Sequence, residues 1–148
     1  MKSGSIWIKR FVLITVITLS CLTSACAGAG DWTSEPLPGN YVVVRSNSES
    51  VQLCIPDDED YTSAVPVAGP IITHIIYNDD YILLKCRKPA DSIKEYFERH
   101  YYIADVKQGE IYGPLDKEPF LKKCEELGLS ELDWKRVETL KKREEPEL

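Results

Sequence analysis

The strongest constraint on the fold is a pair of apolar segments, residues 71–77 and 81–88, separated by the polar turn Asn78-Asp79-Asp80. Both segments are rich in isoleucine, leucine and tyrosine, and β-branched and aromatic side chains favour strands. Asn and Asp favour the tight turns that join neighbouring strands. The pattern therefore predicts an antiparallel β-hairpin.

The register of this hairpin follows from keeping the apolar residues on one face. A two-residue turn at Asn78-Asp79 predicts three pairs on that face: Ile75 with Ile82, Thr73 with Leu84, and Ile71 with Cys86. The opposite face then carries Ile72, His74, Ile76, Tyr81, Leu83 and Lys85. Because that second face is too apolar to lie open to water, we expect another element to cover it.

Four more strands are predicted on either side of the hairpin. They are residues 41–44, 51–55, 101–106 and 111–115. Residues 46–49 join the first two, and a longer loop runs from Pro56 to Val67. Gly109 lies at the tip of the last pair, where it supplies the positive φ that such turns need.

Helices are predicted after the last strand. Asp116 is placed to cap a helix over residues 117–127, and Gly128 ends it. A second short helical segment is expected from residue 132 to 140, and a helical turn at residues 93–97. The sequence thus predicts an α+β fold, an antiparallel sheet of five or six short strands with a C-terminal helix packed on one face.

The N-terminus reads as an export signal. Basic residues precede the uncharged run 11–22, and small residues lead to Cys26, which is the order of a signal peptide. Residues 22–26, Leu-Thr-Ser-Ala-Cys, resemble the lipobox of bacterial lipoprotein precursors, in which the cysteine is diacylated and becomes the mature N-terminus. We predict a signal peptide over residues 1–25 and lipidation of Cys26. The lipid would anchor the chain to the outside of the cell membrane or to the outer membrane.

Other kinds of processing stay open. Cys21 is a second candidate for lipidation, with a shorter apolar core before it. Cleavage by the ordinary signal peptidase at Ala25-Cys26-Ala27 would leave a free secreted protein. Residues 11–29 carry no charge, and without cleavage they would form a membrane helix, since roughly 18 to 20 apolar residues span a bilayer.

The remainder divides into a tether and a domain. Residues 26–40, rich in Gly, Pro and Ser, are predicted to be a flexible tether, and residues 41–148 a single small domain. Removing residues 1–25 takes away three positive charges and no negative charge, so the formal net charge falls from −6 to −9. Such a chain does not offer the basic patch that a phosphate backbone needs, so we expect no nucleic-acid partner.

Three cysteines remain in the predicted domain, Cys54, Cys86 and Cys124. Cys86 is expected on the core face of its strand and Cys124 on the apolar face of the helix, so these two are candidates for a disulfide where the helix covers the sheet. Buried free thiols that act as small apolar side chains fit equally well. Cys54 is expected to point away from its apolar neighbours in the strand.

The sequence predicts no metal or cofactor site. A zinc site needs three or four converging ligands, usually with two close in sequence. The five candidates have neither CxxC nor HxxxH spacing: Cys54, His74, Cys86, His100 and Cys124. Residues 57–60 lack the alternating oxygens and the glycine of a calcium loop, so a solvated loop is favoured. A cysteine nucleophile with His74 or His100 as its base stays open.

Several motifs together resemble one known family. They are the lipobox-like leader, residues 77–82 (Tyr-Asn-Asp-Asp-Tyr-Ile), residues 101–105 followed by 111–115, and Glu118-Pro119-Phe120 before Glu126-Leu127-Gly128. The combination is similar to a family of short bacterial lipoproteins known only as a domain of unknown function. The resemblance implies export and a small mixed fold, and it brings no activity, cofactor or catalytic residue with it.

Two classes of function follow. We expect a non-catalytic binding or interaction module at the cell envelope, attached to the membrane through its lipid and partnered by an envelope protein. The alternative is a small envelope enzyme that uses a cysteine or the acidic loop. Four aromatic residues are candidates for a ligand platform, although packing in strands and core is their more usual role: Tyr101, Tyr102, Tyr112 and Trp134.

Overall fold

The computed structural model describes residues 31–58, 63–88 and 98–144. The leader with Cys26, the second half of the acidic loop and the predicted helical turn at residues 93–97 lie outside these ranges. Among the described helices, none is both long enough and apolar enough to cross a membrane.

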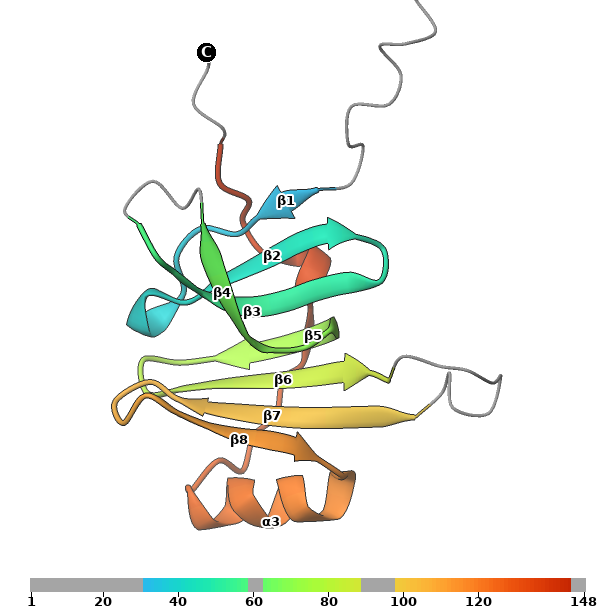
Figure 1. The fold of residues 1–148 in the computed structure, drawn as a ribbon. Coiled ribbons are helices and arrows are strands. Elements are labelled where there is room, and N and C mark those ends of the chain that lie inside the picture. Colours follow the sequence, from blue (N-terminus) through green and yellow to red (C-terminus); the bar gives the residue numbers. More distant parts are fainter. Residues whose placement is uncertain (1–30, 59–62, 89–97, 145–148) are drawn as a thin grey trace, which may run out of the picture.

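The described ranges contain nine strands, one α-helix and two short 3-10 helices (Figure 1). In chain order they are β1 (Trp32–Thr33), η2 (Pro38–Asn40), β2 (Val42–Asn47), β3 (Ser50–Pro56), β4 (Ala64–Ala68), β5 (Ile71–Tyr77), β6 (Tyr81–Arg87), β7 (Arg99–Asp105), β8 (Glu110–Leu115), α3 (Lys117–Glu126), β9 (Lys135–Arg136) and η3 (Val137–Thr139). The broad α+β class is confirmed, but the sheet is larger than the predicted five or six strands.

The sheet has one weak join in its middle. Its strand order is β1-β2-β3-β5-β6-β7-β8, with β4 added to β3 and β9 added to β5. All neighbours are antiparallel except β3 and β5, which share only the parallel pair Val51 and Ile71. Beyond that pair the two halves separate, and β9 takes the free side of β5 at His74 and Ile75. A gap between the two halves of the sheet is therefore built into the topology.

The β5–β6 hairpin forms as predicted, but its register is two residues away from the predicted one. Ile75 lies opposite Leu84, and Tyr77 lies opposite Ile82. The turn is longer than two residues because the Asn78 side-chain oxygen accepts hydrogen bonds from the backbone N–H groups of Asp80 and Tyr81, at 2.9 and 2.8 Å. A shift of two keeps every β6 side chain on its predicted face, since strand side chains alternate with a period of two.

A bulge at Thr73 changes the start of the same hairpin. Beyond it Ile72, and not Ile71, lies opposite Cys86. Ile72 is therefore in the core with Ile75. A bulge adds one residue to a strand, so the residues beyond it point to the opposite face from the one that simple alternation predicts. The hydropathy pattern does not show where such a bulge lies.

Two apolar clusters lie on opposite faces of the sheet. The first contains Leu37, Tyr41, Val43, Val51, Leu53, Ala68, Ile72, Ile75, Ile82, Leu84, Cys86, Ala104 and Val137. The sheet curls around it, so that β4 contacts β8 and the Tyr102 hydroxyl donates a 3.0 Å hydrogen bond to the Gly69 carbonyl. The second contains Leu83, Tyr101, Ile103, Phe120 and Cys124.

Helix α3 closes the second cluster, which confirms the predicted cover for that face (Figure 1). Phe120 and Cys124 are its buried residues, and Phe120 stacks on Tyr101 of β7 with ring centroids 4.6 Å apart. The helix ends at Glu126 with Leu127 as its C-cap, and Gly128 follows with a φ of +71°, which side-chain-bearing residues rarely adopt. Asp116 occupies the N-cap position, although its side chain makes no capping hydrogen bond.

The segment predicted as a tether is partly folded. Leu37 is buried in the first cluster. Ser34 donates its backbone N–H to the Val43 carbonyl, and its side-chain oxygen accepts the Val43 N–H, both at 2.9 Å. The domain therefore begins before the predicted boundary at residue 41, at β1. Strand β1 is only two residues long. Such a strand is too short to show the alternation of apolar and polar residues from which strands are predicted.

The predicted helix at residues 132–140 is absent from the structure. Trp134 packs against the second cluster, whereas Val137 is buried in the first. Between them β9 pairs with β5, so this segment passes from one face of the sheet to the other. An extended crossing reaches both faces, which a helix of this length with one apolar stripe does not.

Candidate functional site

The three cysteines are buried free thiols within the described part of the chain. Cys86 belongs to the first cluster and Cys124 to the second, so the sheet lies between them. Cys54 is buried but belongs to neither apolar cluster. It faces away from its strand neighbour Leu53, as expected. The fold does not bring Cys86 and Cys124 together where the helix covers the sheet.

Cys86 does have a histidine neighbour, since His100 lies opposite it on β7. Burial raises the pKa of the Cys86 thiol to about 12. Burial also lowers the pKa of His100, with Lys88 adding to the effect. A catalytic cysteine reacts as a thiolate and needs a lowered pKa. This pair therefore keeps a protonated, buried thiol at neutral pH and does not form an activated nucleophile.

The other histidine, His74, lies in a cationic neighbourhood. Burial lowers the pKa of its ring most, followed by Lys85 across the hairpin and Arg136 on β9. Its Nδ1 atom is 3.0 Å from the Thr73 hydroxyl oxygen. All three cysteine pKa values are raised. His74 thus has no thiolate to activate among the described residues.

The described residues contain no group of three or more Cys, His, Asp or Glu side chains that converge as metal ligands. In the acidic loop, Asp57 accepts a 3.2 Å hydrogen bond from the Ser63 hydroxyl. Residues 59 and 60 lie outside the described ranges, so the predicted solvated loop is seen only in part.

The aromatic residues pack, as expected. Trp134 lies at 6.3 Å from Tyr101 and 6.0 Å from Phe120, measured between ring centroids. Lys85 Nζ lies over the Trp134 ring at 4.7 Å. Tyr112 also packs against the second cluster. These rings build the contact between sheet and helix, and they do not form an open platform.

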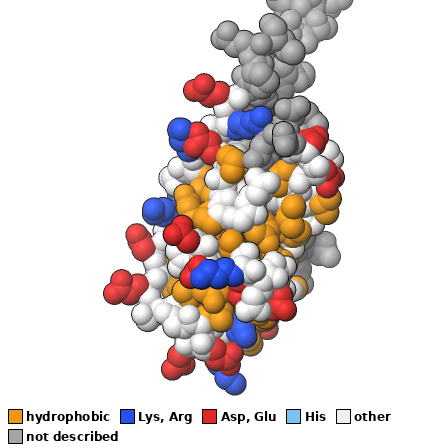
Figure 2. All heavy atoms as spheres, turned by 90° about the vertical axis from the view of Figure 1, so that its left-hand side faces the viewer, with side chains coloured by type: hydrophobic (Ala, Val, Ile, Leu, Met, Phe, Trp, Pro, Cys, Tyr) orange, Lys and Arg blue, Asp and Glu red, His pale blue; other side chains and the backbone are white. Residues whose placement is uncertain are grey.

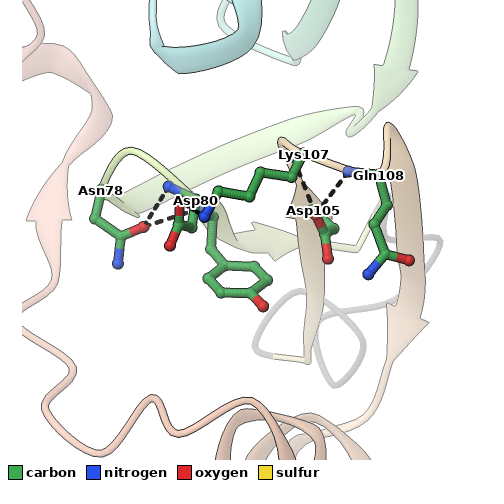
Figure 3. A network of polar contacts seen from close by, with 6 residues as sticks. Asn78, Asp80, Asp105, Lys107 and Gln108 are labelled. Carbon is green, nitrogen blue, oxygen red and sulfur yellow. Dashed lines mark hydrogen bonds and ion pairs between the residues drawn. The ribbon is translucent and has the colours of Figure 1, made fainter.

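A polar network joins the two hairpin turns (Figure 3). The buried Asp105 carboxylate accepts hydrogen bonds from the backbone N–H groups of Lys107 and Gln108, at 3.0 and 2.9 Å. Lys107 also forms a 2.8 Å ion pair with Asp80 of the neighbouring turn. The hydrogen bonds of Asn78 and Asp105 hold the two turns, and the ion pair links them, so we assign the network a structural role.

The turn end of the molecule has a mixed surface. Figure 2 shows hydrophobic side chains across the middle of this face, with acidic and basic side chains around them.

Two exposed apolar residues, Ile55 and Val65, are partners across β3 and β4, with 42 and 50% of their surfaces accessible. They are the most exposed apolar pair in the described sheet.

The remaining feature is a cavity of about 160 Å³ at the gap between the two halves of the sheet. Its polar lining consists of Arg45, Ser48, Thr73, Arg87 and Glu138. Its apolar and aromatic lining consists of Trp32, Val51, Ile71, Ile72 and Val137. The two residues that join β3 to β5, Val51 and Ile71, thus form part of its wall.

Arg45 gives this cavity its chemical character. It lies between Trp32 of β1 and Val51 of β3, both its register partners. Its Nε atom is buried and has no hydrogen-bond partner within the described structure. A buried N–H of a charged group that lacks an acceptor costs about 1–3 kcal/mol or more. Native structures rarely leave such a group unpaired without a reason, and a ligand is one such reason.

Charge of the opposite sign lies at the same cavity. Glu138 on η3 is exposed, and it forms none of the ion pairs observed in the described structure. Arg45 and Glu138 therefore share a cavity without pairing with each other. Neither residue is among the candidates that the sequence predicts.

Comparison with known proteins gives a family and nothing beyond it. No curated protein and no solved structure shows significant similarity to this chain. A family model described as a protein of unknown function (DUF3997) matches residues 38–138, and so takes in strands β2 to β9, α3 and every cavity-lining residue except Trp32. The chain belongs to this DUF3997 family of proteins of unknown function.

Proposed function

We propose that the protein is an exported lipoprotein, anchored through Cys26, whose domain binds a small ligand in the Arg45 cavity without performing covalent chemistry. The observation that carries the binding role is that Arg45 lines a cavity and that its buried Nε has no acceptor in the described structure. Binding sites are concave, with few polar groups placed among apolar ones. This cavity is more polar than that, with five polar and five apolar or aromatic lining residues, which suits a small charged ligand.

The groups at the cavity favour binding over catalysis. A guanidinium is always protonated in proteins and acts by binding and orienting anions. The Cys86 thiol, the best-placed nucleophile of the enzyme alternative, has a pKa raised to about 12. None of the described cavity-lining residues is a cysteine or a histidine.

The envelope address rests on the sequence. The basic start, the apolar run and the small residues before Cys26 support export, and they orient the folded domain away from the cytoplasm. The membrane is then the first partner, through the lipid. An envelope protein remains the proposed second partner, and the exposed Ile55–Val65 pair is the surface that supports it.

Intact-mass analysis of the protein from the host membrane fraction tests the anchor. We expect a chain of residues 26–148 that carries a diacylglycerol group. A Cys26→Ala precursor should lack the lipid, while a Cys21→Ala precursor should be processed normally. An unmodified chain that begins at residue 28, or an intact Met1, would contradict the anchor and leave a secreted or helix-anchored protein.

A further inference from the structure

We propose that the Arg45 cavity is a receptor for a small zwitterion, a molecule that carries one carboxylate and one ammonium group, as an amino acid does. The assignment deepens the proposed function and rests on it, since it names the ligand class for the same cavity. Three features of the cavity point to this class: a guanidinium whose buried Nε has no acceptor in the described structure, a carboxylate that forms none of the observed ion pairs, and a small apolar floor.

The carboxylate end of the ligand belongs at Arg45. A guanidinium matches a carboxylate with two parallel hydrogen bonds. Arg45 lines the cavity, its Nε donates no hydrogen bond to the described protein, and its guanidinium takes part in none of the ion pairs of the described structure. Arg87 lines the same cavity and adds a second positive charge. These hydrogen bonds are strong because the site is partly withdrawn from water.

The ammonium end belongs at Glu138. This carboxylate lies at the same cavity and takes part in none of the ion pairs of the described structure. A ligand with negative charge alone would approach Glu138 at an electrostatic cost. A zwitterion presents a positive group to Glu138 and a negative group to Arg45, so it complements both charges.

The size of the cavity limits the rest of the ligand. A volume of about 160 Å³ is close to that of an engineered cavity of about 150 Å³ that binds benzene, a molecule of six heavy atoms. Ile71, Ile72 and Val137 form an apolar floor. The ligand is therefore of the size of glycine or alanine, with room for a small apolar side chain.

Calorimetric titration of the full-length, lipid-anchored protein in detergent micelles tests this assignment. The probes are L-alanine, D-alanine, glycine, propionate, ethylammonium and inorganic phosphate. We expect at least one of the three amino acids to bind at least about tenfold more tightly than propionate, ethylammonium or phosphate. Binding of none of the amino acids, or equal binding of propionate or phosphate, overturns the assignment.

Two variants separate the two charges. Arg45→Gln should weaken amino-acid binding by at least about thirtyfold, as loss of a buried charge partner does. Glu138→Gln should weaken amino-acid binding by at least about tenfold and leave propionate binding no weaker than before. Lys122→Gln, an exposed change on α3 away from the cavity, is the matched control and should bind as the parent does.

Loss of ligand binding is distinguished from misfolding and from loss of the lipid anchor by separate measurements. If Arg45→Gln does not fold by circular dichroism, the Glu138→Gln variant decides, because Glu138 is exposed and its replacement leaves the core intact. Unchanged amino-acid binding in a folded Arg45→Gln protein, or in Glu138→Gln, overturns the zwitterion site. A lipid-modified chain that binds none of the probes overturns the ligand class and leaves the envelope address standing.

Discussion

Cys86 and Cys124 are both buried, and they lie on opposite faces of the same sheet. Cys86 packs with the residues inside the curl of the sheet, and Cys124 packs beneath α3 with Phe120. Since a disulfide needs Cα atoms within about 7 Å, a bridge would require one of these thiols to pass through a hydrogen-bonded sheet. The thiols act here as small apolar side chains.

The cysteine arrangement predicts three free thiols in the folded domain. Thiol titration after denaturation, without a reducing agent, should detect Cys54, Cys86 and Cys124. Reduction should leave the intact mass unchanged. A mass increase on reduction that is abolished by both Cys86→Ala and Cys124→Ala would establish the bridge and contradict this fold.

The pKa of Cys86 predicts an alkaline loss of stability. Burial raises this pKa from its ordinary value of 9.0 to about 12. The unfolded state therefore loses its proton first, and the stabilisation is complete below pH 9 and declines as the pH rises toward 12. Up to about 4 kcal/mol of unfolding free energy is at stake. Urea unfolding across this range should show a shallower decline for Cys86→Ala, and an equal decline would contradict the assignment.

Helix α3 should hold the second face through Phe120. This side chain is 1% exposed and stacks on Tyr101, whereas its neighbour Leu121 is 44% exposed. Phe120→Ala should lower the free energy of unfolding by about 3–5 kcal/mol, because it leaves a cavity in the core. Leu121→Ala is the matched control, with an expected change below about 1 kcal/mol. Similar losses for the two variants in urea unfolding would refute the packing of this helix.

Two glycines of the β7–β8 hairpin should respond differently to alanine. Both have positive φ, +68° at Gly109 and +145° at Gly113. A Cβ at Gly109 meets no atom within 4 Å, whereas at Gly113 it meets the Tyr102 ring and lies 2.9 Å from the Tyr101 carbonyl oxygen. Gly109→Ala should cost about 1 kcal/mol, the strain of φ alone, and Gly113→Ala clearly more. Thermal unfolding compares them, and the reverse order would contradict the hairpin geometry.

Much of the sheet was predictable because strands with one buried face alternate with a period of two. The pairs β2–β3, β5–β6 and β7–β8 follow from that pattern, as does the cover over Leu83. The register of β5–β6 does not, because it depends on hydrogen bonds to the Asn78 side chain. Strand β4 was missed because Pro66 is typical of loops, although an edge strand tolerates it.

The cavity was beyond sequence reasoning. Arg45 precedes Ser46 and Asn47 at the end of a strand, which is where a solvated arginine is expected. Its register partner Trp32 lies thirteen positions earlier, and the η3 residues that line the same cavity lie some ninety positions later. One signal was present, since Arg45 continues the inward alternation of Val43 across from Val51. Only the fold shows that no acceptor accompanies it.

The most direct test of the binding role is the side-chain NMR signal of the Arg45 Nε–H group, assigned by its loss in Arg45→Lys. Titration with the amino acid that binds most tightly should move this signal to saturation, while the signal of the exposed Arg136 stays in place. An Arg45 signal that does not move, or equal movement of both arginine signals, would contradict a ligand site in this cavity.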